Sequence, residues 1–139
     1  MIRKAPISMI MTTPVITLEK TDSLEKAEHL FKKHHIRHIP VVENNKIVGM
    51  LSQTDLLRLS FADFSENTSD YSNALVYNMF TINQFMNRHI VTISVSNSIK
   101  EVAEILASHE FHALPVIAHN KLVGIVTTTD LIKYFLKQY

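Results

Sequence analysis

The sequence predicts an α+β protein built from two copies of one β-α-β-β-α unit. A shift of 75 positions places residues 11–59 on residues 86–134 without a gap. Within each copy, short apolar runs typical of strands alternate with the three-to-four spacing typical of helices. A duplicated unit implies pseudo-two-fold packing, so a site formed by one copy should have a counterpart in the other.

The size of each copy indicates how the two copies pack. The chain has 139 residues, of which 46% are hydrophobic and 19% are charged. A half of about 50–60 residues makes a marginal core by itself, so we expect the halves to share one apolar interface. We assign residues 1–62 to repeat 1, residues 63–80 to a linker and residues 81–139 to repeat 2.

Each copy begins with a short strand and a helix. The β-rich runs cover residues 15–18 and 90–93. Ser23 and Ser98 carry a side chain that is preferred at a helix N-cap. The apolar residues that follow at helical spacing are expected in the core: Leu24, Ala27, Leu30 and Phe31, and in copy 2 Ile99, Val102, Ala103, Ile105 and Leu106.

A strand pair and a second helix complete each copy. Apolar runs flank Asn-bearing turns, which predicts hairpins at residues 39–51 and 114–126. Gly49 and Gly124 lie inside the second strands, where glycine often marks close approach of another backbone or a ligand. Close packing of the two sheets is the alternative explanation for these glycines.

The connection between the copies has two parts. Residues 60–73 are polar and turn-rich, and we expect an exposed, mobile loop there. Residues 74–80 are apolar enough to form a short helix that docks on the body.

Composition disfavours several classes of protein. The net charge is +1 without runs of like charge, which argues against nucleic-acid and membrane-surface partners. There is no cysteine, no signal-like segment and no apolar stretch long enough for a bilayer, so a cytoplasmic protein is expected. Two glycines cannot form a phosphate-cradling loop, and no catalytic motif occurs, so we expect no enzyme activity, no catalytic residue and no required cofactor.

The histidines do not predict a metal site. His34 and His38 are four residues apart, a spacing that places two imidazoles on one face of a continuous helix. The helix should end near His35, however, before the next strand begins. We therefore interpret these side chains as structural or surface histidines.

Three segments, repeated in order at one spacing, carry a family resemblance. They are the opening segment Met-Thr-Thr-Pro-Val-Ile-Thr at residues 11–17, Ile-Arg-His-Ile-Pro-Val-Val at residues 36–42, and Gly-x-x-Ser/Thr-x-Thr-Asp-Leu at residues 49–56 and 124–131. Over nearly its whole length the chain resembles a tandem CBS-domain (Bateman) module. The resemblance implies two repeats packed sheet to sheet, with a cleft that holds up to two adenosine-containing ligands such as AMP, ADP, ATP or S-adenosylmethionine. It also implies a homodimer that regulates another domain or protein.

The residue types in these segments suit a nucleoside phosphate. Free amides at a helix N-terminus favour an anionic group, and nearby hydroxyls add donors. A short carboxylate suits the paired hydroxyls of ribose, and apolar side chains suit a purine ring. The candidates are Ser52, Thr54, Thr127 and Thr129 for phosphate, Asp55 and Asp130 for ribose, and Val15, Ile16, Ile90 and Val91 for the base. The alternative is that Thr-Asp at a helix start serves only as a cap.

The family likeness also pairs the two copies. It implies that the opening segment of one copy faces the Asp motif of the other, so that Val15 and Ile16 meet Asp130, while Ile90 and Val91 meet Asp55. Before its proline, copy 1 has Arg37 and His38, whereas copy 2 has His112 and an alanine. We expect unequal affinities, with phosphate held best where Arg37 and His38 reach.

Two functions are compatible with these residues. The first is a stand-alone regulatory module that binds an adenosyl ligand in the cleft between its repeats and signals to a partner protein. The second is a ligand-free homodimerisation or scaffold module, in which the aspartates only cap helices.

Overall fold

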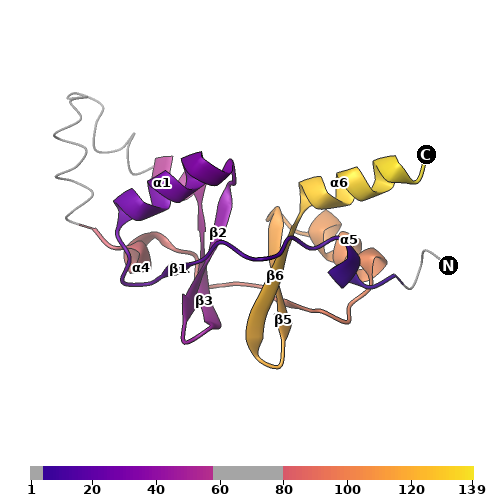
Figure 1. The fold of residues 1–139 in the computed structure, drawn as a ribbon, viewed down its shortest axis with the longest axis horizontal. Coiled ribbons are helices and arrows are strands. Elements are labelled where there is room, and N and C mark those ends of the chain that lie inside the picture. The colour runs from indigo at the N-terminus through magenta and orange to yellow at the C-terminus, as the bar shows by residue number, and fades with distance from the viewer. Residues whose placement is uncertain (1–4, 58–79) are drawn as a thin grey trace. The chain divides into compact units, whose positions relative to one another are not determined.

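The structure, a computed structural model, describes residues 5–57 and 80–139. The chain forms two compact units, and each unit contains segments of both repeats (Figure 1). Unit 1 comprises Met1–Val15 with Val91–Tyr139, and unit 2 comprises Ile16–Ile90. The units therefore do not coincide with the sequence repeats, whose assigned boundaries stay a prediction.

Unit 2 is a three-stranded sheet with helices. Its sheet has the order β1-β2-β3, in which β1 runs parallel to β2 and β2 runs antiparallel to β3. Residues 53–57 are helical directly after β3. The bounds are β1 (Leu18–Glu19), α1 (Leu24–His34), β2 (His38–Glu43), β3 (Lys46–Ser52) and α4 (Ile82–Phe85).

Unit 1 repeats this plan with the same sheet order, β4-β5-β6. Its register also matches, because Val116 pairs with Gly124 just as Val41 pairs with Gly49. The bounds are η2 (Ile7–Met9), β4 (Ile93–Ser94), α5 (Ile99–Ser108), β5 (Ala113–Ala118), β6 (Lys121–Thr127) and α6 (Thr128–Lys137). The predicted α+β class and the strand-helix-strand-strand-helix order are confirmed.

Local chemistry explains where the helices and hairpins begin and end. Ser23 and Ser98 are N-caps, and each hydroxyl accepts a hydrogen bond from the backbone N–H three residues later. Both hairpins turn through two consecutive residues with positive φ, the backbone of a type I′ turn. These turn residues are Asn44, Asn45, His119 and Asn120.

The first strands are shorter than predicted. β1 begins at Leu18 and β4 begins at Ile93, so residues 15–17 and 90–92 are not strand. Only two residues of each strand pair with the neighbouring strand, Leu18 with Val41 and Glu19 with Val42 in unit 2. Residues 15–17 and 90–92 have the composition of a strand, but they do not pair with a neighbouring strand in either sheet. The predicted loop at 60–73 and most of the predicted helix at 74–80 lie outside the described residues.

The residues at and just before the opening segment of each repeat pack in the core of the other repeat. Ile7 is completely buried among residues of α5, β5, β6 and α6, and Figure 1 shows η2 beside α5. Ile82 and Met86 are buried among residues of α1, β2 and β3. The predicted helical stripes are confirmed as core, since Leu24, Phe31 and their counterparts Ile99 and Leu106 are buried.

The same segments explain both strand glycines. A Cβ on Gly49 would lie 2.5 Å from Met86 Sδ and 3.2 Å from the carbonyl oxygen of Asn87. A Cβ on Gly124 would lie 2.5 Å from Met11 Sδ. The close neighbour at both glycines is the side chain of an opening-segment methionine, which was not expected from the sequence, and at Gly49 a backbone oxygen lies beside it.

Candidate functional site

Asp130 closes a capping box at the start of α6. The Thr127 backbone N–H donates to Asp130 Oδ2 at 2.9 Å, and the Asp130 N–H donates to Thr127 Oγ1 at 3.2 Å. Both side chains are half-buried. Each box of this kind satisfies two backbone donors that the helix itself leaves unpaired.

Asp55 makes the same arrangement after β3. The Ser52 backbone N–H and hydroxyl donate to Asp55 Oδ2 at 3.4 and 2.8 Å, and the Asp55 N–H donates to Ser52 Oγ at 3.1 Å. Both aspartates therefore cap their helices, as the alternative explanation predicted. In the described part of the chain, the hydrogen bonds of Asp130 involve Oδ2 and its backbone, and none involves Oδ1.

Backbone hydrogen bonds join each opening segment to the strand that precedes the helix carrying Asp55 or Asp130. In unit 1, Thr12 N donates to Ile125 O at 2.7 Å, and Ile125 N donates back at 3.2 Å. In unit 2, Met50 N donates to Asn87 O at 2.9 Å, and Asn87 N donates back at 2.8 Å. Each pairing connects two different repeats and lies two residues before a capping hydroxyl.

The predicted base-binding residues are divided between the units. Val15 shares unit 1 with Asp130, and Ile90 shares unit 2 with Asp55, and the expected contacts between them stay predictions. Ile16 belongs to unit 2 and Val91 to unit 1, so their expected pairings stay predictions. Val91 is 40% exposed, whereas the other three side chains are half-buried.

The predicted basic residues adjoin the helix starts through the backbone. Arg37 O accepts a hydrogen bond from Gln53 N at 2.8 Å, and His38 pairs with Ser52 across the sheet. In unit 1, His112 O accepts from Thr128 N at 2.9 Å. Of the remaining candidates, Thr54 and Thr129 are exposed in the first turns of their helices.

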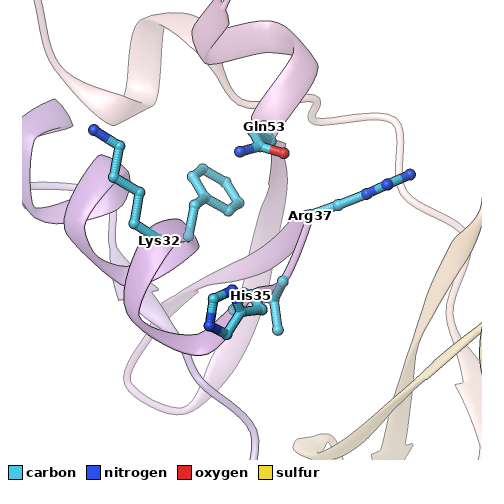
Figure 2. A pocket seen from close by; sticks show the side chains of 6 residues that line it. Lys32, His35, Arg37 and Gln53 are labelled. Carbon is cyan, nitrogen blue, oxygen red and sulfur yellow. The ribbon is translucent and has the colours of Figure 1, made fainter.

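A pocket that the sequence patterns do not predict lies in unit 2, at the end of α1. It has a volume of about 420 Å³ and is lined by Phe31, Lys32, His35, Ile36, Arg37 and Gln53. Figure 2 shows Lys32, His35, Arg37 and Gln53 around the pocket, with Arg37 extended away from Lys32. Only Arg37 was among the predicted site residues. The other five come from α1, its C-terminal turn and the start of the next helix, which only folding brings together.

Two further findings bear on the class of protein. Within residues 5–57 and 80–139, no three His, Asp or Glu side chains are grouped so as to hold a metal ion. In the same ranges, no helix combines the length and the apolar character needed to cross a bilayer.

Comparison with known families assigns the chain. The profile of the CBS domain matches residues 7–62 and again residues 82–137. The chain belongs to the CBS domain family. Its two matched segments coincide with the duplicated sequence, so the protein carries a pair of CBS repeats.

Relatives and solved structures support this assignment. Protein MJ1225 of Methanocaldococcus jannaschii is 28% identical over 90% of this chain, which spans 45% of MJ1225. The CBS domain-containing protein YhcV of Bacillus subtilis is 29% identical over 87% of this chain and 79% of its own length. The CBS domain pair of protein MJ0100 superposes with a TM-score of 0.77 at 26% identity, covering 97% of this chain and 98% of that one. That structure contains 5′-methylthioadenosine and S-adenosyl-L-methionine.

Proposed function

We propose that this CBS pair is a regulatory module that binds an adenosine-containing ligand beside the start of the helix that follows β3 or β6. The ligand class is AMP, ADP, ATP or S-adenosylmethionine. Ligand occupancy then changes the state of a partner protein. A ligand has this effect only if it binds the two states of the module with different affinity.

The observation that carries the proposal is that, in each unit, hydrogen bonds join the opening segment of one repeat to the strand of the other repeat that precedes Asp55 or Asp130. In unit 1 the Thr12–Ile125 hydrogen bonds hold the chain before Val15 against the strand that ends at Thr127. Unit 1 thus contains the apolar side chain of Val15, the hydroxyls of Thr127 and Thr129, and the carboxylate of Asp130. The adenosyl ligands of the MJ0100 pair, at 26% identity, support the same ligand class for this chain.

The chemistry of unit 1 suits a nucleoside. Asp130 keeps Oδ1 outside the capping box, and this oxygen can accept hydrogen bonds from ribose hydroxyls. The exposed hydroxyl of Thr129 and the backbone amides at the start of α6 suit phosphate. In unit 2, Arg37 adds a permanent positive charge. We therefore propose that phosphorylated ligands favour unit 2, whereas unit 1 accepts ligands with less phosphate.

Thermal unfolding with added ligand tests the proposal. AMP, ATP and S-adenosylmethionine are titrated against the purified chain, and a bound ligand at about 100 times its Kd stabilises the folded state by about 2.7 kcal/mol. Asp130→Ala and Asp55→Ala should each reduce the ligand-dependent rise in Tm, and the two substitutions together should abolish it. Both variants also lose a capping box, which lowers the Tm without ligand by itself.

Glu101→Ala is the matched control for that loss. Glu101 closes a capping box with Ser98 at the start of α5, in the same unit as Asp130. This variant should lose stability and keep the full ligand-dependent rise. If none of the ligands raises the Tm of the unaltered protein, the adenosyl proposal is rejected.

A homodimerisation module is the second candidate function. Ile132, Phe135 and Leu136 recur at i, i+3 and i+4 along α6, and they are 52%, 49% and 69% exposed. Leu57, at the position of Ile132 in the other repeat, is 48% exposed. We propose that a second copy covers these apolar side chains. Sedimentation velocity should then show a dimer with or without ligand, and Leu136→Glu should dissociate it while Lys133→Glu does not.

A further inference from the structure

The pocket at the end of α1 is lined by both apolar and polar residues. Phe31 and Ile36 form its apolar part, and the backbone N–H of Ile36 donates to Phe31 O at 3.3 Å. The polar lining consists of Lys32, His35, Arg37 and Gln53 (Figure 2). All of these side chains can donate hydrogen bonds, and no carboxylate lines the pocket.

The charge around the pocket is positive. Arg37 is exposed and permanently charged. Lys32 is paired with Glu28 at 2.8 Å, one helical turn earlier, so it contributes less. His35 and Gln53 add an imidazole and an amide to the lining (Figure 2). An anion with an apolar body matches this combination.

His35 occupies a backbone position that favours other residues. It is the C-cap of α1 with φ of 53°, in the left-handed region where glycine or asparagine is preferred. Its N–H donates to Phe31 O, which closes the helix. A histidine here places an imidazole beside the pocket at some cost in backbone energy. In the other repeat, α5 ends without a left-handed C-cap, since His109 has φ of −128°.

The duplicated repeat offers an internal comparison. A shift of 75 residues places Lys32, His35 and Arg37 on Ala107, Glu110 and His112. Repeat 2 thus lacks the lysine and the arginine and has a carboxylate in place of His35. The two repeats share their fold, so the basic set in unit 2 is not required by the fold.

We infer that unit 2 has a second binding site, at the end of α1, for a small organic anion whose phosphate or carboxylate contacts His35, Gln53 and Arg37 while its apolar body rests on Phe31 and Ile36. The site shares Arg37 with the adenosyl site proposed above, and its other lining residues are not part of that site. Gln53 and Asp55 are two residues apart in one helix, which separates them by about 200° around its axis. A volume of about 420 Å³ suits a ligand of this size.

NMR titration of the labelled 139-residue chain tests the inference. The probes are phenyl phosphate and benzoate, which distinguish a phosphate from a carboxylate. Inorganic phosphate is the control for the anion alone, and benzyl alcohol is the control for the apolar body alone. At least one of the first two should shift the Gln53 side-chain amide and the His35 ring resonances. That probe should bind about fivefold or more tightly than either fragment, as expected when polar and apolar contacts act together.

The variants are chosen to preserve the fold. His35→Asn and His35→Gly both suit the left-handed C-cap, and each should weaken binding of the probe by about fivefold or more. His34→Asn is the matched control, since His34 is exposed and does not line the pocket. Asp55→Ala should leave the probe's shifts at Gln53 unchanged even where it abolishes adenosyl binding. Equal binding of the probe by His35→Asn and the unaltered chain, or the absence of any probe that binds more tightly than both of its fragments, would overturn the inference.

Discussion

At the scale of single residues, close packing against a methionine accounts for glycine at two strand positions. Neither glycine has a positive φ, so the constraint is space and not backbone conformation. The nearest atoms to a Cβ on Gly124 all belong to Met11, whereas Gly49 also faces the carbonyl oxygen of Asn87. A side chain can move more easily than a paired backbone.

We therefore predict that Gly49→Ala and Gly124→Ala each destabilise the protein by about 1–3 kcal/mol, the usual cost of overpacking. Combining Gly124→Ala with Met11→Ala should recover most of the steric cost in a double-mutant cycle. Gly49→Ala with Met86→Ala should recover less, because the contact with Asn87 O at 3.2 Å remains. Denaturant unfolding measures each term. Equal recovery at the two sites would contradict this account.

At the scale of elements, the helices depend on their first turns. Capping boxes begin α5 and α6, and an equivalent box begins the helix at residues 53–57. In α5, the backbone hydrogen bond from Ser98 lowers the pKa of Glu101 below its usual 4.5, and the Ser98 hydroxyl adds to this effect. A lowered pKa means that the ionised carboxylate favours the folded state.

The contribution of Glu101 should consequently depend on pH. It is fully present above the unfolded pKa of 4.5 and is lost as pH falls through the lower folded value. We predict that the unaltered chain exceeds Glu101→Gln in Tm at pH 7, and that the difference shrinks as the pH is lowered below 4.5. The glutamine keeps an acceptor for the Ser98 N–H and cannot ionise. The other acidic residues are the same in both proteins, so their effect on Tm cancels when the two Tm values are subtracted.

Carboxyl NMR of Glu101 provides a direct check. The midpoint should lie below 4.5 and should rise in Ser98→Ala, where the hydroxyl is removed. A pH-independent difference in Tm, or a midpoint at or above 4.5, would show that the hydrogen bonds to Ser98 have no such effect.

At the scale of the whole molecule, each compact unit needs a segment from the other repeat. Ile7 and Ile82 are both fully buried, each in the core of the repeat to which it does not belong by sequence. The two repeats therefore depend on each other for completion of their cores. This arrangement also agrees with the expectation that a repeat of about 50–60 residues is marginal alone.

Amide hydrogen exchange should show that each core depends on a segment of the other repeat. Ile7→Ala should destabilise by about 2–5 kcal/mol and should speed exchange across residues 91–139 more than across residues 16–57. Ile82→Ala should have the opposite pattern. Met9→Ala, in the same short helix as Ile7 but at a side chain that is 67% exposed, should change neither region. Uniform acceleration by both isoleucine variants would show that the units do not open separately.

Local sequence signals were sufficient for the α+β class, the repeat, the helix N-caps, the hairpins and the family. These features depend on spacing and capping chemistry, which residues such as Ser23, Ser98, Asn44 and Asn45 display directly. Contacts between residues far apart in the chain were not predictable in this way. The seating of Met11 on Gly124 and of Met86 on Gly49 follows from long-range packing, as does the grouping of Phe31, His35 and Gln53 around one pocket. The aspartates illustrate the division well, since a cap and a ligand site require the same local residues, and only neighbours brought by the fold can favour one over the other.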